Sequence, residues 1–203
     1  SVRVVLNDVA HAFAAGSRLR LALSTSYWPL VWPSPEPVEL TVFAGAGALT
    51  LPVRPPRPED EALRRFEPAE GAPGPEVSEL DDARSGRILT RHPQSGETRL
   101  AVFVDQDEAG QPALSRIEPI DLEVGYGVRV RHAVHPAAPG AARSEIEHTT
   151  ALRRPGWDVR TSTRTRIRAD GKHFFVEAEL SAEEDGQEVF RRHFDERVPR
   201  EGR

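Results

Sequence analysis

Alternation of apolar and polar residues with a period of two is the feature that most restricts what this chain can fold into. Its longest run covers residues 157–168. One face of that run carries Trp157, Val159 and Ile167, and the other carries four arginines, Arg160, Arg164, Arg166 and Arg168. A period of two places successive side chains on opposite faces of an extended strand. We therefore expect a strand with its arginines in solvent and its apolar side chains, Trp157 included, against a core.

Shorter runs of the same kind recur along the chain, at residues 18–23, 38–42, 100–104, 128–131, 174–180 and 189–194. Asp-Gly pairs at Asp170-Gly171 and Asp185-Gly186 separate the last runs and are typical of hairpin turns. The only helix signal is a short one at residues 58–66. Eight or more antiparallel strands must pair as sheets or close. The sequence therefore predicts an all-β protein, a two-sheet antiparallel sandwich of the jelly-roll type.

Residues 54–82 break the strand pattern with six prolines and many acidic residues. We interpret them as a long surface excursion within a single domain that spans residues 1–203. A linker between two domains is the competing interpretation. We disfavour it because the roughly 50 residues before it offer only three or four strands, too few for a stable core.

Composition and charge exclude several classes of protein. The 203 residues include no cysteine, which excludes disulfides, thiolate metal ligands and cysteine nucleophiles. A formal net charge of −5 argues against nucleic acid as a partner. No apolar run approaches the roughly 20 residues that span a bilayer, and residues 1–7 lack the apolar core of a signal peptide. We therefore expect no membrane partner and a cytoplasmic location.

Two further compositional features concern origin. Lys172 is the one lysine among 27 basic residues, a bias typical of a G·C-rich, here bacterial, genome. The chain also contains no methionine, which indicates a processed or engineered product or a piece of a longer protein.

Motifs for catalysis or cofactor binding are absent from the sequence. There is no G-x-S-x-G elbow, no phosphate-binding loop and no G-x-G-x-x-G, so we predict no catalytic residue and no cofactor. Gly125 and Gly127 form only a G-x-G, which we interpret as turn or bulge glycines. His132 and His135 are an odd number apart and would point to opposite faces of a strand, which argues against a shared metal.

Two charged groups have a simple structural explanation. Asp105, Asp107 and Glu108 resemble the start of a calcium loop, but the rest of that pattern is missing, so we interpret them as a solvated turn. The arginines of residues 160–168 could bind phosphates. Glutamates on neighbouring runs, at 145, 147, 177 and 179, explain them instead as cross-strand ion pairs on a solvated face.

An aromatic stretch, residues 24–37 (STSYWPLVWPSPEP), is the strongest candidate for an interaction site. It places Tyr27, Trp28 and Trp32 within six residues and adds four prolines. Prolines fix the backbone, so little entropy is lost when such a surface docks. A core plug at one end of the sandwich is the alternative. We predict that Tyr27, Trp28, Trp32 and Trp157 form an interface or binding surface.

The same region carries a resemblance to a known family. Residues 7–42, with Leu51-Pro52-Val53-Arg54 after them, resemble the start of the C-terminal domain of the cocaine-esterase and X-Pro dipeptidyl-peptidase family of serine hydrolases. Residues 153–157 (RRPGW) and 198–200 (VPR) resemble later parts of that domain. The resemblance implies a jelly roll of the galactose-binding type that follows an α/β-hydrolase catalytic domain. The family's nucleophile, acid and base belong to the hydrolase part, so no position here inherits a catalytic role.

Two functions follow from the resemblance and the residues. The first is a non-catalytic accessory domain that packs against an α/β-hydrolase domain of the same polypeptide, stabilises it and helps shape its active-site entrance. The parent protein would then be a serine hydrolase, an esterase or dipeptidyl-peptidase. The second is an independent jelly-roll module that binds a carbohydrate or peptide. In the first case, part of the aromatic stretch is left bare in the isolated chain, and we expect self-association through it.

Overall fold

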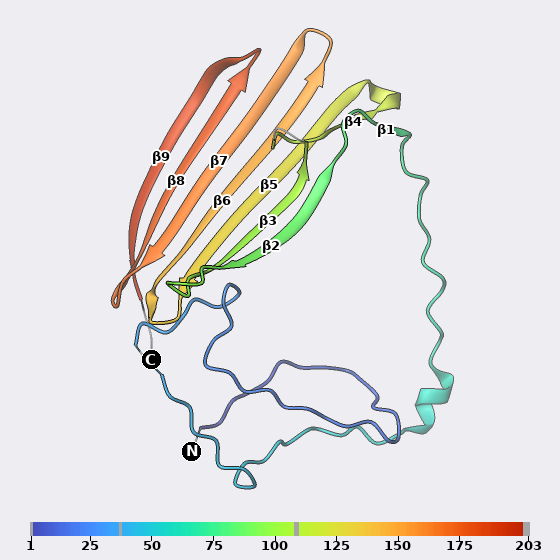
Figure 1. Ribbon diagram of the computed structural model, residues 1–203. Coiled ribbons are helices and arrows are strands. Elements are labelled where there is room, and N and C mark those ends of the chain that lie inside the picture. The colour runs from blue at the N-terminus through green and yellow to red at the C-terminus, as the bar shows by residue number, and fades with distance from the viewer. Residues whose placement is uncertain (1, 37, 108–109, 201–203) are drawn as a thin grey trace.

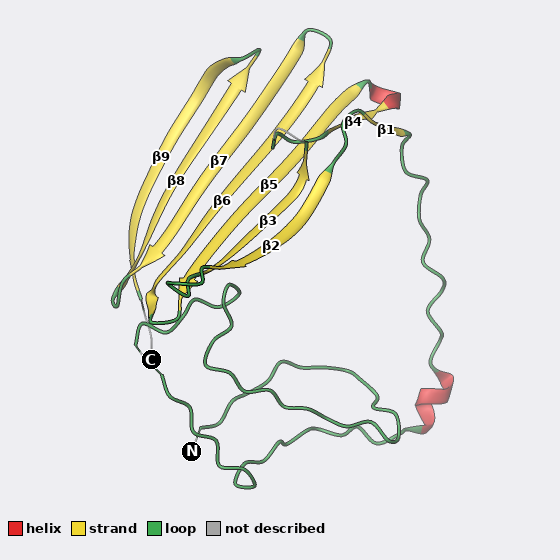
Figure 2. Ribbon diagram, viewed as in Figure 1, coloured by secondary structure: helices red, strands yellow, loops and turns green. Residues whose placement is uncertain are grey.

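The computed structural model describes residues 2–36, 38–107 and 110–200, and nearly all of its regular structure is β (Figures 1 and 2). Its strands are β1 (Val77–Glu79), β2 (Arg84–Arg91), β3 (Thr98–Gln106), β4 (Leu114–Ile117), β5 (Leu122–His135), β6 (Ala138–Arg154), β7 (Trp157–Ala169), β8 (His173–Glu184) and β9 (Gln187–Pro199). Two short 3-10 helices accompany them, η1 (Pro58–Ala62) and η2 (Glu118–Ile120). The predicted all-β class is confirmed.

All nine strands belong to one antiparallel sheet. Its order is β1-β4-β5-β6-β7-β8-β9, and the β2–β3 hairpin pairs with the second half of β5. The sheet is open, with β9 at one edge and not closed into a barrel, and this is consistent with one layer of a sandwich (Figure 1). The jelly-roll connection and the galactose-binding type stay predictions.

The register gives the sheet two chemically different faces. On one, here named the charged face, Arg131, Glu145, Arg166 and Glu177 lie opposite one another across four strands. The other, the apolar face, carries many aliphatic side chains, among them Leu100, Val102, Val128, Val130, Ile146, Leu152, Val159, Ile167, Val176 and Leu180. The arginines of β7 thus lie on the face opposite to Val159 and Ile167, as predicted.

Few of these apolar side chains are fully covered. The buried hydrophobic residues of the described chain are Leu100 and four alanines, Ala113, Ala133, Ala142 and Ala151. A sheet normally buries its apolar face against a second layer of structure. Here Phe190, Phe194 and Val198 of β9 remain exposed, so much of the apolar face is available to another layer.

Residues 2–36 and 38–76 run as extended chain and turns, and the only regular element in these two ranges is η1. The strands predicted at residues 18–23 and 38–42 are therefore wrong for this structure. Alternation alone does not make a strand, because the backbone N–H and C=O groups need a neighbouring strand to pair with. Both runs keep their apolar side chains exposed, among them Leu21 and Leu40.

The hairpin turns predicted at the Asp-Gly pairs are confirmed. The β7–β8 and β8–β9 hairpins turn at the two Asp-Gly pairs. Asp185 and Gly186 both have positive φ, 50° and 75°, as both central residues of a type I′ hairpin turn require. The helix expected at residues 58–66 is present as η1, which is shorter. Glu108 of the acidic turn and Pro37 of the aromatic stretch lie outside the described residues.

Gly125 and Gly127 correct another expectation. They lie inside β5, in regular pairing with β6, and not in a turn or bulge. A Cβ on Gly125 would stand 2.7 Å from Leu114 Cδ2 and 3.1 Å from Pro112 Cβ, and one on Gly127 would stand 3.3 Å from Pro112 Cα. These glycines are needed because the segment before β4 crosses directly over β5.

Candidate interaction site

The aromatic stretch meets the sheet at one end of the apolar face (Figure 1). Trp28 and Trp32 pack edge to face, with ring centroids 4.8 Å apart. Trp28 also contacts His132 of β5 at 5.5 Å, and Trp32 contacts Phe174 of β8 at 5.5 Å. Such edge-to-face pairs are favourable because the positive ring edge meets the negative ring face. The two tryptophans therefore anchor the stretch to the sheet.

Arg200 closes this contact from the end of the chain. Its guanidinium lies 4.9 Å from the ring centre of Phe174, donates a hydrogen bond to the Asp170 carbonyl at 3.0 Å and donates another to the Pro33 carbonyl. Pro33 is buried, and Trp32 Nε1 is buried without a hydrogen-bond partner in the described structure. Residues 167 positions apart are thereby held together at one corner of the sheet.

The other half of the aromatic stretch faces solvent. Tyr27 is 65 % exposed and Leu30 75 % exposed, with Val31 exposed beside them. A turn hydrogen bond from the Val31 amide to the Tyr27 carbonyl, 2.9 Å, holds these side chains in place. The structure thus divides the predicted surface into an anchor, Trp28 and Trp32, and an exposed apolar group.

Trp157, the fourth predicted residue, is not part of this group. It is the first residue of β7 and lies at the opposite end of that strand from the β7–β8 turn next to Phe174 (Figure 1). Its side chain is 37 % exposed, so it does not face a core as expected. A strand end has too few neighbours to cover an indole.

His132 makes the anchor sensitive to pH. Burial lowers the pKa of His132 below its ordinary value of 6.5, so the unfolded chain takes up a proton at a higher pH than the folded chain does. The free energy of unfolding should therefore fall as the pH falls from 7.5 to 5.5. The melting temperature measured across this pH range tests the prediction, because the carboxylates begin to titrate only at lower pH.

The control for this prediction is His132→Gln, which cannot titrate. Its melting temperature should change less between pH 7.5 and 5.5 than that of the parent chain. Equal slopes for the two proteins would show that the pH dependence comes from other groups.

The charged face carries a network of ion pairs. Arg164 donates to Glu147, with Nε 2.9 Å from Oε1, and Arg131 reaches both Glu145 and Glu147 at 3.4 Å. Burial alone would raise the pKa of Glu147, but the hydrogen bond from Arg164 and the nearby positive charges outweigh it, and the pKa is lowered. The cross-strand pairing predicted for the arginines of residues 160–168 is confirmed for Arg164, Arg166 and Arg168.

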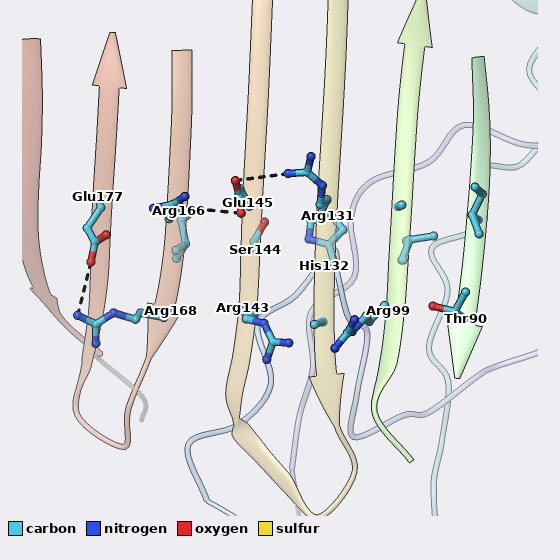
Figure 3. Close-up of a pocket in the computed structure, with 15 residues that line it drawn as sticks. Thr90, Arg99, Arg131, His132, Arg143, Ser144, Glu145, Arg166, Arg168 and Glu177 are labelled. Carbon is cyan, nitrogen blue, oxygen red and sulfur yellow. Dashed lines mark ion pairs between the residues drawn. The ribbon is translucent and has the colours of Figure 1, made fainter. Parts of the chain in front are cut away.

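One end of the charged face is hollowed (Figure 3). The hollow has a volume of about 520 Å3 and spans β2 to β8. Its lining includes five arginines, Arg99, Arg131, Arg143, Arg166 and Arg168. Two carboxylates, Glu145 and Glu177, line it as well, so the formal charge of the lining is 5 − 2 = +3 although the chain carries −5.

Among the described residues, no three or more histidine or acidic side chains cluster in a way that could hold a metal ion. No helix in the described ranges is long and apolar enough to cross a bilayer.

Comparison with known families identifies the part of the chain that contains the aromatic stretch. Residues 1–53 match the model of the X-Pro dipeptidyl-peptidase C-terminal non-catalytic domain. The resemblance to that domain is confirmed by this match, and the later motifs at 153–157 and 198–200 lie outside it. No curated protein and no solved structure gave a significant match. The match supports an accessory domain of a peptidase for this part of the chain.

Proposed function

We propose that this chain is a non-catalytic accessory part of an α/β-hydrolase of the acyl-esterase or X-Pro dipeptidyl-peptidase type. Its apolar surfaces pack against the catalytic domain, stabilise it and contribute to the wall of the active-site entrance. The parent enzyme is a serine hydrolase whose triad lies wholly in the catalytic domain.

One observation carries this proposal: the residues that match a non-catalytic peptidase domain leave their apolar side chains uncovered. Val2, Val5, Val9 and Leu30 are each more than 70 % exposed, and Leu19, Leu21 and Leu23 each more than 50 %. Apolar surface costs about 25 cal/mol per Å2 to keep in water. Soluble proteins therefore rarely leave large contiguous apolar patches bare unless a partner covers them.

The exposed half of the aromatic stretch extends this surface toward the sheet. Because Trp28 and Trp32 fix the backbone, Tyr27, Leu30 and Val31 are presented with little freedom left to lose on docking. The catalytic domain would then contact residues 2–31 and the nearby end of the apolar face as one continuous surface.

Binding to the separately expressed catalytic domain tests the proposal. The hydrolase segment of the same reading frame, mixed with the 203-residue chain, should form a 1:1 complex by analytical ultracentrifugation. Leu21→Asp should abolish it, because burying an unpaired carboxylate in an apolar contact is costly. Arg20→Asp is the matched control on the neighbouring residue and should bind normally.

Other outcomes of this experiment would contradict the proposal. A reading frame without a hydrolase segment, or a complex indifferent to Leu21→Asp, would exclude docking through residues 2–31. Retention of the chain on a carbohydrate or peptide matrix, lost on Tyr27→Ala with no hydrolase present, would favour the independent binding module instead. Dimers of the chain that persist when the hydrolase is added would show that the surface serves self-association.

The isolated chain should not hydrolyse activated esters or Xaa-Pro amides. Among the described residues, no serine hydroxyl donates to a histidine; Ser85 Oγ, for example, donates to the Asp105 carboxylate at 3.2 Å and accepts from the Asp105 amide at 3.0 Å. Turnover should stay at the buffer rate in a p-nitrophenyl acetate assay and a Gly-Pro-p-nitroanilide assay. Turnover that a serine-directed inhibitor abolishes would show a serine nucleophile in this chain and contradict the prediction.

A further inference from the structure

The hollow on the charged face is built from two neighbouring cross-strand rows (Figure 3). In the first row positive and negative side chains alternate, as Arg131, Glu145, Arg166 and Glu177. The second row has no carboxylate at its strand positions and runs Arg99, Ala133, Arg143, Arg168 and Phe175. We propose that this second row binds an acidic peptide segment in extended conformation, a site that is independent of the docking surface proposed above.

Arg143 and Arg168 lie directly opposite each other on β6 and β7. Like charges at directly opposed positions are unfavourable in a sheet, and here Glu97 at 2.9 Å from Arg143 and Glu177 at 3.6 Å from Arg168 offset the repulsion. The neighbouring pairs, Arg166 with Glu145 and Arg164 with Glu147, place opposite charges together. A local violation of the pairing rule within an otherwise regular face is typical of a site that is completed by a ligand.

The ion pairs of the second row leave donors available. Arg168 reaches Glu177 at 3.6 Å and stacks on Phe175, with its guanidinium carbon 4.3 Å from the ring centre. Its side chain is 61 % exposed. A guanidinium has five N–H donors arranged as a fork that fits a carboxylate with two parallel hydrogen bonds. The stacking on Phe175 holds this fork at the edge of the hollow.

The row already holds one carboxylate of its own chain. Glu97 accepts from Arg99 Nε at 2.5 Å and from Arg143 Nη2 at 2.9 Å, and thereby bridges two arginines across β5. The hydrogen bonds from Arg99 and Arg143 lower the pKa of Glu97 although burial opposes this. The geometry that a bound carboxylate needs is therefore present at one end of the row, and at the other end Arg168 extends over β8 toward Glu177 (Figure 3).

The length of the row points to a peptide. Arg99 and Arg168 are three strand intervals apart, about 14 Å at about 4.8 Å per interval. Alternate side chains of an extended chain are about 6.8 Å apart, so three acidic residues at alternate positions span the same length. A single phosphate or carboxylate group would reach only one pair of arginines. The small residues Ala101 and Ala133 form the floor and leave room for the peptide backbone.

Isothermal titration of the 203-residue chain with an acetylated, amidated Glu-Ala-Glu-Ala-Glu peptide tests this proposal. Binding is expected at low salt and should weaken as salt is added, because the pairs are solvent-exposed. Arg168→Gln should weaken it about tenfold, the usual scale for losing a charged hydrogen bond. Arg160→Gln is the matched control, since Arg160 lies on the same strand and face outside the hollow and contacts Gln111.

Unfolding of the same variants gives a second, independent readout. Arg168→Gln should change the melting temperature of the ligand-free chain only slightly, because it removes the like-charge pair with Arg143 together with the exposed ion pair to Glu177. The proposal fails if the Gln-Ala-Gln-Ala-Gln peptide binds as well as the acidic one, if no binding is detected at low salt, or if Arg168→Gln binds like Arg160→Gln. It also fails if inorganic phosphate displaces the peptide at equal concentration, which would make the hollow a site for small anions.

Discussion

Gly125→Val is expected to lower the free energy of unfolding by about 2–3 kcal/mol, the upper range for overpacking a packed site. The Cβ alone would stand 2.7 Å from Leu114 Cδ2 and 3.3 Å from the Ala113 carbonyl oxygen, and valine adds two methyl groups to it. Strand propensity by itself predicts the opposite sign, since valine favours strands over glycine by up to about 1 kcal/mol. The packing cost exceeds this gain because Pro112 and Ala113 are buried and cannot move outward.

Urea denaturation measures this effect, and the chain offers a matched control. Gly140 lies in β6 with no atom within 4 Å of the position that a Cβ would take, so Gly140→Val should be neutral or slightly stabilising. The difference between the two variants isolates packing from propensity. Equal stabilities would mean that the segment before β4 does not cross over β5.

β3, β5, β7, β8 and β9 could be predicted because their signal is local, whereas β1, β2, β4 and β6 were not predicted. The run at 157–168 became β7, and the Asp-Gly pairs became hairpin turns, since the positive φ of Asp185 and Gly186 is a property of the turn itself. The expectation failed for residues 18–23 and 38–42, where the same alternation occurs. Their state depends on which strand is available to pair with, and a single run of residues does not contain that information.

The like-charge pair in the charged hollow could have been predicted from the sequence. Pro155-Gly156 is a two-residue turn, and once Arg154 pairs with Trp157 the register places Arg143 opposite Arg168. Counting outward from the turn would therefore have exposed the like-charge pair. The contacts of Trp32 with Phe174 and of Arg200 with Pro33 could not be found this way, because no local pattern relates residues more than 140 positions apart.

Trp32→Ala is expected to lower the melting temperature of the 203-residue chain by about 3–6 °C. A large apolar side chain contributes about 1.5–3 kcal/mol when fully buried, and Trp32 is only partly buried, so the low end applies. For a chain of this size, 1 kcal/mol corresponds to about 2–4 °C. Trp28→Ala should act in the same direction. The two effects should not add, because the rings contact each other at 4.8 Å.

Tyr27→Ala separates anchoring from docking. Tyr27 is 65 % exposed and contributes little to the folded chain, so its loss should change the free energy of unfolding by less than about 0.5 kcal/mol. If the exposed half of the aromatic stretch meets the catalytic domain, the same substitution should weaken that complex at least tenfold, as large aromatics in interface centres do. A stable Tyr27→Ala chain that still docks with full affinity would restrict the aromatic stretch to its anchoring role, with the docking surface formed by residues 2–23 alone.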